Sequence, residues 1–446
     1  MSSYSHPLTM VLKPIETIRD NMKVSSFLFR QGITSSLLTI SLLLLSLLFV
    51  NWQINILGME KYGLLVLLLS VFGTINMLNI GIGSAMVDYY TKYGEDKSVF
   101  WSIFIVAFFF ILSVSIFLMV FSSLFYREVF NLLSVEKENL NLFAYYGFAL
   151  IGVSRLLGSI TTSYWVARVD FLMLKLFGFA NIYLSITTLL TLYSLGLSFN
   201  SSLFYAGLIN FLTVIAITIR IIASSINIEN LSPFVTTKHH YKEFISSGFQ
   251  FQLLSIINNL SNPIINTLIN THFGLYAVSL FDVALKLLRS GRQIIVSATE
   301  PFFGKITQLN NQNKILLMRL LVLKYTKYMM LISFVFVVIT IFSSHFILKV
   351  WMGENIANSI YMTVNIISVG FSVNIISSIV YNKYLAIKIF RKYVLFHQLI
   401  LLVLTTTPFI LPLMSLHDYA LYYSIAYIFS SGYLLVIFYT HRGNLN

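Results

Sequence analysis

Twelve hydrophobic runs, each long enough to cross a lipid bilayer, constrain this chain more than any other feature. A helix needs about 20 predominantly apolar residues to span the hydrocarbon core. The runs lie at about residues 32–54, 63–87, 99–122, 141–163, 171–193, 202–226, 244–269, 274–298, 322–345, 358–382, 394–414 and 417–440. Polar residues interrupt the seventh and eighth runs. The sequence therefore predicts an all-α polytopic membrane protein with about twelve transmembrane helices.

The scarcity of charged residues supports this class. Of the 446 residues, 57% are hydrophobic and 10% are charged, whereas a soluble globular chain has about 25% charged residues. A water-soluble particle of this composition would expose apolar patches over much of its surface. A cytoplasmic enzyme, a secreted disulfide scaffold and a disordered chain are therefore excluded. The chain has no Cys, so disulfides, thiolate metal sites and cysteine nucleophiles are excluded as well.

The distribution of Lys and Arg predicts the orientation in the membrane. With the N-terminus placed inside, the inside segments contain 21 basic residues when four at the inside ends of their spans are counted with them (Lys175, Arg220, Lys324 and Lys327). The outside loops contain 4, and 4 others lie within the spans. Cytoplasmic loops of membrane proteins are enriched in Lys and Arg, so both termini are expected in the cytoplasm. We attribute the net charge of +13 to these loops. No nucleic-acid-binding motif is present, and no nucleic-acid partner is expected.

Polar segments predict the domain boundaries. Residues 1–31 are expected to form a cytoplasmic amphipathic leader, because their apolar positions fall near helical spacing; a disordered leader is the alternative. The polar stretch at 227–243 is expected to be a cytoplasmic linker that separates six spans from six. The chain would thus consist of an N-lobe at 32–226 and a C-lobe at 244–446.

The two lobes show a weak internal repeat. An aromatic-Gly-Leu motif stands near the second span of each half, as Tyr62-Gly63-Leu64 and as Phe273-Gly274-Leu275. Because each half has an even number of spans, the halves are expected to be parallel repeats about a pseudo-two-fold axis normal to the membrane. Chance similarity between apolar segments is the alternative.

The eighth span carries an unusual set of charges. At about 100° per residue, Asp282, Lys286, Arg289 and Gln293 fall within a sector of about 60°, with Arg292 to one side. Ionisable groups in the bilayer cost about 2.5–3.5 kcal/mol on insertion scales, so they are expected to face a polar interior. The surplus of cations predicts that Lys286, Arg289 and Arg292 bind an anionic substrate and that Asp282 serves coupling or gating. Alternatively, Asp282 and Lys286 pair across one turn while both arginines extend to the lipid headgroups.

Arg155 in the fourth span is the corresponding candidate in the first half. Gly152 and Gly158 flank it, and such small residues allow neighbouring helices to approach closely. We predict that Arg155 also binds the substrate; a side chain that extends to the headgroups is the alternative.

Asp88 and Pro263 are predicted to serve coupling or gating. Asp88 ends the second span and could bind a coupling cation, or it could simply pair with Lys92 one turn away. Pro263 removes one backbone hydrogen bond within the seventh span. Interrupted helices mark the binding sites of many transporters, although a purely structural kink is equally compatible with this proline.

Motifs of enzymes are absent from the sequence. It contains no phosphate-binding GxxxxGK[ST] loop, no HExxH and no GxSxG. The outside loops are short, and the histidines have no spacing that predicts a metal site. We therefore expect a transporter rather than an enzyme, without a cofactor or metal site, driven by an H+ or Na+ gradient or by the gradient of its substrate.

Three short motifs carry a resemblance to a known family. LGMEKYGL at residues 57–64, followed by LNIGIGSA at 78–85, resembles the opening of Wzx-type polysaccharide flippases of the MOP exporter superfamily, which handle O-antigen or capsule repeat units. SATEPFF at 297–303 resembles the segment before a long inside loop in that family. The twelve spans, their six-plus-six division and the lack of soluble domains fit as well. Asp88 departs from the pattern, because many relatives carry a basic residue there.

The resemblance implies a function. Such proteins have a MOP/MATE-like fold and move undecaprenyl-pyrophosphate-linked oligosaccharides from the cytoplasmic to the periplasmic leaflet of the bacterial inner membrane, by alternating access between two lobes. The implied partners are the lipid-linked oligosaccharide, membrane lipids, a glycan polymerase and a chain-length regulator. Arg155, Lys286, Arg289 and Arg292 would then form a cationic central cavity for the pyrophosphate, and aromatic residues such as Tyr62 could stack on sugars.

Three other functions stay open. A MATE-like multidrug or ion antiporter would be expected to carry a surplus of acidic groups inside, which this sequence lacks. A membrane glycan polymerase or ligase would be expected to have a large outside loop with catalytic Arg or His. An exporter of teichoic acid or capsule with the same fold would differ in its cargo alone.

Overall fold

The computed structural model describes most of the chain. It covers residues 8–75, 97–135, 140–167, 170–225, 238–297, 314–387, 391–410 and 415–440, together with 299, 306 and 309. Every regular element within these ranges is a helix, as expected for a chain whose backbone polar groups must be satisfied within the bilayer. Asp88 lies outside the described residues, and so does most of the predicted linker.

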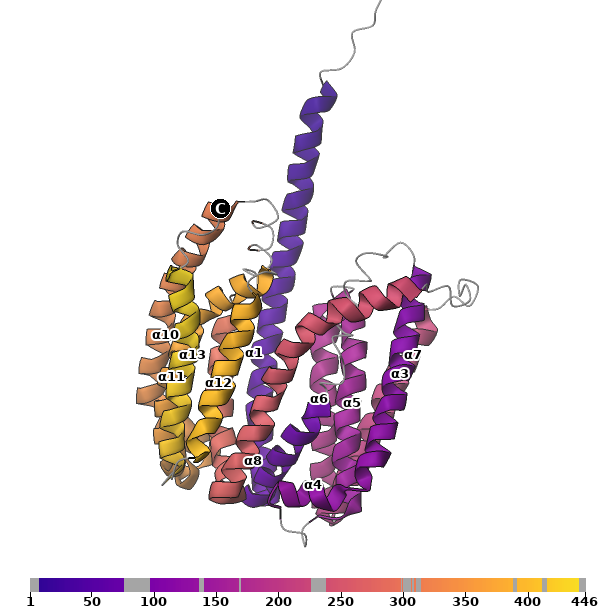
Figure 1. Cartoon of the computed structure of the whole chain (residues 1–446), viewed down its shortest axis with the longest axis vertical. Helices are drawn as coiled ribbons and strands as arrows, with labels where there is room; N and C mark the ends of the chain where they lie inside the picture. Colours follow the sequence, from indigo (N-terminus) through magenta and orange to yellow (C-terminus); the bar gives the residue numbers. More distant parts are fainter. Residues whose placement is uncertain are drawn as a thin grey trace, which may run out of the picture.

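Twelve helical elements form the described part of the molecule (Figure 1). They are α1 (Leu8–Phe72), α3 (Lys97–Ser123), α4 (Tyr126–Leu132), α5 (Leu142–Ala167), α6 (Phe171–Ser194), α7 (Phe199–Ser225), α8 (Lys238–Ser297), α10 (Ile315–Met352), α11 (Glu354–Ala386), α12 (Arg391–Thr406), the short 3₁₀ helix η5 (Thr407–Ile410) and α13 (Leu416–Thr440). Among the described residues, 10 helices are long and apolar enough to cross a membrane. The chain is thus a multi-pass membrane protein, as the sequence predicted.

Glycines in the left-handed region divide the two longest helices. A straight helix of the 60 residues of α8 would extend about 90 Å, about three times the hydrocarbon core. Instead, Gly274 has φ 83° and ψ 173°, and Gly58 in α1 has φ 76° and ψ 167°. Only glycine adopts such angles without strain from a Cβ atom. Each helix is therefore a helical hairpin with two arms.

The division of α1 and α8 explains why 10 candidate membrane helices among the described residues correspond to twelve predicted spans. Split at Gly58 and Gly274, the 10 described candidate helices give segments at all twelve predicted positions. The second arm of α1 is described as far as residue 75. A third glycine of the same kind, Gly353 with φ 88° and ψ 166°, joins α10 to α11.

The hairpins correct one detail of the predicted repeat. The sequence matched Gly63 with Gly274, but the glycine of α1 that has the backbone conformation of Gly274 is Gly58. Gly63 instead lies within the second arm of α1, where a Cβ atom would overlap the backbone carbonyl of Leu275 and the Ser279 hydroxyl. Its role is close packing between two helices rather than a turn.

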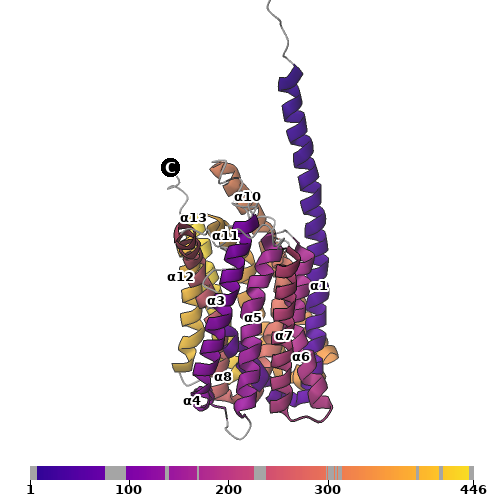
Figure 2. The same ribbon diagram turned by 90° about the vertical axis from the view of Figure 1, so that its right-hand side faces the viewer.

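The helices form two lobes that meet at α1 and α8. On one side α5 packs against α7, α6 and α3, which lie next to each other in Figure 2. On the other side α11 packs against α10, α13 and α8. A buried cluster that includes Val50, Tyr62, Ile265 and Phe281 joins α1 to α8. The first residues of α1 and the last of α13 lie at one end of the molecule (Figure 1), and the two hairpin turns lie at the other.

The domain boundaries predicted from the sequence fall partly on described residues. Helix α1 is continuous from Leu8 through the predicted end of the leader at residue 31. Helix α8 begins at Lys238, inside the predicted linker. The exact boundaries stay predictions.

Candidate functional site

The predicted polar stripe on the second arm of α8 spreads over three environments. Asp282 and Lys286 contact the N-lobe, Arg289 lies where cavities meet, and Arg292 and Gln293 face the inside of the C-lobe. Helical periodicity placed these side chains on one face. The curvature and packing of α8 decide which neighbours that face meets along its length.

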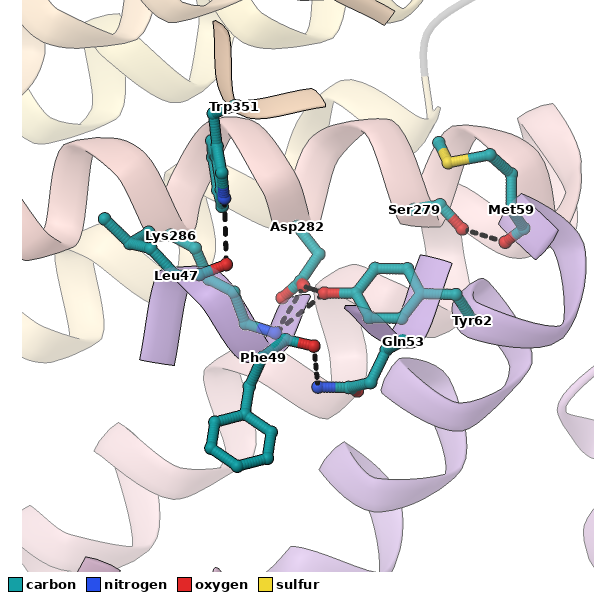
Figure 3. Close-up of polar contacts among 9 residues, drawn as sticks. All are labelled: Leu47, Phe49, Gln53, Met59, Tyr62, Ser279, Asp282, Lys286 and Trp351. Atoms are coloured by element: carbon teal, nitrogen blue, oxygen red, sulfur yellow. Dashed lines mark hydrogen bonds and ion pairs between the residues drawn. The ribbon is translucent and has the colours of Figure 1, made fainter. Parts of the chain in front are cut away.

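A tyrosine of the N-lobe completes the first environment (Figure 3). The Tyr62 hydroxyl donates to Asp282 Oδ2 at 2.5 Å, and Lys286 Nζ donates to the Tyr62 oxygen at 2.7 Å. Lys286 Nζ also lies 2.9 Å from Asp282 Oδ2, as the i,i+4 spacing predicted. We call these three residues the Tyr62 cluster. It joins the second arm of α1 to the second arm of α8.

Further contacts hold the lobes together near the Tyr62 cluster. Ser279 Oγ donates to the Met59 carbonyl at 2.5 Å, and Trp351 Nε1 of α10 donates to the Leu47 carbonyl at 2.8 Å (Figure 3). The close approach of Gly63 to Leu275 lies between the same two arms. The lobes are thus closed against each other near the hairpin turns.

A cavity of about 260 Å³ lies between the lobes next to this closure. We call it the interlobe cavity. The N-lobe contributes residues of α1, α5 and α6, and the C-lobe contributes both arms of α8. Its charged lining residues are Arg155, Asp282, Lys286 and Arg289. The structure therefore brings three of the four predicted substrate-binding residues together in one cavity, with one carboxylate.

Arg155 reaches this cavity from the middle of α5. A Cβ atom on Gly152 would overlap the Phe72 carbonyl, and one on Gly158 would overlap the Asn181 amide. The two glycines therefore let α5 pack closely against α1 and α6, as the sequence predicted. Within the described part of the chain, Arg155 Nε has no hydrogen-bond partner. This atom is buried, but the half-buried guanidinium lines the interlobe cavity, and its planar set of donors is suited to an anionic ligand.

Arg289 is shared between cavities. Its Nη2 atom donates to Asn262 Oδ1 on the first arm of α8 at 2.8 Å. The side chain lines the interlobe cavity, a cavity of about 350 Å³ inside the C-lobe, and an adjoining space of about 290 Å³. The positive charge of Arg289 would attract an anionic ligand in any of these three spaces.

Arg292 does not line the interlobe cavity. Its Nε atom donates to Asn374 Oδ1 of α11 at 2.7 Å, and it lines the 350 Å³ cavity between α8, α11, α12 and α13. We call this space the C-lobe cavity. Gln293, which helical periodicity places on the same face as Asp282, also lines this cavity and not the interlobe cavity. The position along the helix, about 15 Å beyond Asp282, therefore separates the two cavities.

Pro263 and Asp88 were the other gating candidates. Pro263 is buried in the first arm of α8, and the helical backbone continues through it. The non-helical residue of α8 is Gly274. Asp88 lies outside the described residues. The gating roles of both stay predictions.

Tyr62 is the residue that sequence reasoning assigned differently. The sequence indicates a tyrosine that could stack on sugars, whereas the structure buries it fully in the Tyr62 cluster. Nothing in its sequence surroundings indicates a partner 220 residues away. Among the described residues there is no group of three or more His, Cys, Asp or Glu that could hold a metal ion.

Comparison with known proteins identifies the fold. No family model matches the sequence, and no curated protein matches it. Among solved structures, the lipid II flippase MurJ in an inward closed conformation is similar with a TM-score of 0.68 and 16% identity, over 91% of this chain and 87% of that one. An inward-facing multidrug resistance MATE family transporter of the MOP superfamily has a TM-score of 0.66 and 12% identity, over 92% of this chain and 100% of that one.

A third structure with this fold comes from Pyrococcus furiosus. It is a MOP superfamily transporter described by the reverse polarity of its binding pocket, with a TM-score of 0.62 and 11% identity over 92% of this chain and 94% of that one. These similarities confirm the predicted two-lobed, all-helical MOP/MATE-like fold. The chain has the fold of MOP superfamily transporters.

Proposed function

We propose that the chain is a flippase that moves an undecaprenyl-pyrophosphate-linked oligosaccharide from the cytoplasmic to the periplasmic leaflet of a bacterial inner membrane. The observation that carries this proposal is the charge of the interlobe cavity. Arg155 of the N-lobe and Arg289 of the C-lobe both line it. The carboxylate among its described lining residues, Asp282, is already engaged by Lys286 and Tyr62. The cavity therefore has a positive surplus from both lobes.

A pyrophosphate suits this surplus. Moving phosphate charges through bare hydrocarbon is prohibitive, so a carrier must supply compensating cations. The guanidinium of arginine offers a planar fork of donors that matches phosphate oxygens. In a cavity of lower dielectric constant than water, each attraction is stronger. The oligosaccharide would follow through the polar cavity while the polyprenyl chain stays in lipid between the lobes.

The Tyr62 cluster supplies a link between binding and movement of the lobes. It contributes to closing the lobes near the hairpin turns. A pyrophosphate in the interlobe cavity would compete with Asp282 for Lys286. That competition would weaken the contact between α1 and α8 and so favour opening at the hairpin end, which is the step that alternating access requires.

Flipping by purified protein in vesicles tests the proposal. A fluorescent polyprenyl-pyrophosphate oligosaccharide is incorporated, and its exposure to a membrane-impermeant quencher is measured with time. We expect Arg289→Gln to slow flipping at least about tenfold, the effect of about 1.4 kcal/mol in an activation barrier. Arg289→Lys should restore part of the rate, because it keeps the charge and loses the fork. Arg220→Gln is the matched control, since Arg220 is exposed on α7.

The same assay can contradict the proposal. Normal flipping by the Arg155→Gln, Lys286→Gln and Arg289→Gln variants alike would exclude an anion-binding role for the interlobe cavity. Equal flipping of a polyprenol-linked oligosaccharide without phosphate would exclude recognition of the pyrophosphate.

A MATE-like multidrug or ion antiporter is the second candidate. Asp282 favours it, because this carboxylate lines the interlobe cavity. An antiporter for cationic drugs would move a cationic dye across the vesicle membrane in exchange for H+ or Na+ that moves down its own gradient. Asp282→Asn would abolish this transport. If the chain is a flippase for an anionic lipid-linked substrate, no transport of the dye is expected.

The location in the bacterial inner membrane, with both termini in the cytoplasm, belongs to the same proposal. Reporter fusions after Lys97, Lys242 and Lys392 should report the cytoplasm, and fusions after Lys137 and Lys349 the periplasm. A single clear inversion would contradict the orientation. On this proposal a glycan polymerase and a chain-length regulator would receive the flipped substrate.

A further inference from the structure

The C-lobe cavity has an unusual charge for a space inside one bundle of helices. Its charged lining residues among those described are Arg289 and Arg292, and no carboxylate is among them. The two arginines are three positions apart on α8 and therefore lie on neighbouring parts of one helix face. Two cations near each other in a space of low dielectric constant repel each other more strongly than in water.

Neutral groups satisfy these arginines in part. Asn374 Oδ1 accepts from Arg292 Nε at 2.7 Å, and Asn262 Oδ1 accepts from Arg289 Nη2 at 2.8 Å. An amide oxygen completes a hydrogen bond but cannot neutralise a charge. Asn262 lines both the interlobe cavity and the adjoining space of about 290 Å³, as Arg289 does. Arg292 lines the C-lobe cavity and neither of these two spaces, so it is the cation that depends on the C-lobe cavity for neutralisation.

The remaining walls of the cavity are polar. The Ser377 and Ser378 hydroxyls donate to backbone carbonyls of α11, and Asn382 Nδ2 donates to Thr299 Oγ1. Because an amide nitrogen carries two N–H groups, the amides of Asn382 and Gln398 each retain a donor for a ligand, as does the Tyr381 hydroxyl. Hydrogen-bond donors arranged around a cation without a carboxylate partner are typical of an anion-binding site. A volume of about 350 Å³ can hold a small anion with several waters.

We propose that the C-lobe cavity binds a small inorganic monovalent anion, chloride being the abundant one, beside Arg292. The bound anion neutralises Arg292 and removes its repulsion with Arg289. Arg289 then remains available to the interlobe cavity. This site is separate from the interlobe cavity and does not depend on which substrate the protein moves.

Anion-dependent stability of the purified full chain tests this site. The chain is unfolded by heat in detergent at constant ionic strength while gluconate is replaced by chloride. A ligand that binds the folded state alone stabilises it by RT ln(1 + [L]/Kd), so the melting temperature should rise by several degrees. Binding of radioactive chloride should saturate near one ion per chain.

Two substitutions locate the site. Arg292→Gln should lower chloride affinity at least about tenfold and remove the shift in melting temperature. Asn374→Asp places a resident carboxylate at the atom that already contacts Arg292. This variant should fold stably without chloride and lose the response to chloride. Arg155→Gln and Arg220→Gln should both retain the response, because neither residue lines the C-lobe cavity.

Several results would overturn the proposal. One is a wild-type chain whose stability is the same in chloride and gluconate. Another is a chloride response that survives in Asn374→Asp, whose carboxylate should exclude the anion even if Arg292→Gln fails to fold. Stabilisation by inorganic phosphate without any by chloride would overturn the assignment to a monovalent ion.

Discussion

The two lobes begin with the same backbone feature and use it differently. In each, a glycine in the left-handed region, Gly58 or Gly274, divides a long helix into a hairpin. The second arms of these hairpins pack against each other across the interface between the lobes. The arm of α1 supplies Tyr62 and the small Gly63, whereas the arm of α8 supplies most of the interior charge.

This difference shows that a repeated fold does not repeat its chemistry. The interior arginine that the N-lobe contributes to the interlobe cavity lies on α5, as Arg155, and not on the hairpin. The C-lobe places Lys286, Arg289 and Arg292 on one arm of its hairpin. The N-lobe hairpin therefore provides the surface against which the charged arm packs. Substitutions where the two arms meet should therefore have larger effects than substitutions at the hairpin turns or on the surface, and the four predictions below test this.

The largest effect is expected at Gly63. Gly63→Ala places a Cβ atom against the Leu275 carbonyl and the Ser279 hydroxyl, so the arms must separate. Overpacking of this kind costs about 1–3 kcal/mol, and backbone atoms cannot move aside as a flexible side chain can. We expect a loss near the upper end of that range in thermal or denaturant unfolding. Gly178→Ala on α6 is the control, because nothing lies within 4 Å of the new atom.

The Tyr62 cluster should give the next largest effect. Tyr62→Phe removes a hydroxyl that is hydrogen-bonded to both Asp282 and Lys286, and a hydrogen bond to a charged group contributes about 1.5–3 kcal/mol. The double variant with Asp282→Asn should lose less than the sum of the two single losses. Strict additivity in a double-mutant cycle of unfolding free energies would mean that the residues of the cluster act independently.

The hairpin glycines should have a smaller and equal effect. Gly58→Ala and Gly274→Ala each force an L residue into the left-handed region, at about 1–2 kcal/mol, while no atom lies within 4 Å of either new Cβ. Equal losses of stability would support the same backbone role in both lobes. A much larger loss at Gly274 would show that the charged arm also depends on the angle of its turn.

The smallest effect is expected for the ion pair at the α10–α11 turn. Lys349 Nζ lies 2.5 Å from Glu354 Oε2, but the two side chains are 50% and 54% exposed. Exposed ion pairs contribute little to stability. Lys349→Gln should leave the unfolding temperature unchanged within error, in contrast to Lys286→Gln in the Tyr62 cluster. A large loss of stability in Lys349→Gln would contradict the expectation that interior charges contribute more to stability than surface charges.

The sequence predicted the local contacts of the candidate residues better than their contacts with distant parts of the chain. The i,i+4 contact between Asp282 and Lys286 followed from helical spacing, and the packing of Gly152 and Gly158 beside Arg155 followed from their size. Tyr62 was not expected in this contact, because its partners lie 220 and 224 residues away in the chain. The separation of Arg292 and Gln293 from the interlobe cavity depends on which helices pack against each turn of α8, and helical periodicity carries no information about those neighbours.

The sequence by itself determined that the chain is a multi-pass helical protein, where its spans lie and which face of the eighth span is polar. These properties follow from rules that act along the chain, namely the thickness of hydrocarbon and the helical period. Only the tertiary structure decided that Gly58 rather than Gly63 makes the turn, that Tyr62 contacts Asp282, and that Arg289 lines the interlobe cavity while Arg292 does not. Those outcomes depend on how close-packed helices cross and on which side chains then meet, and contacts across hundreds of residues leave no local pattern in the sequence.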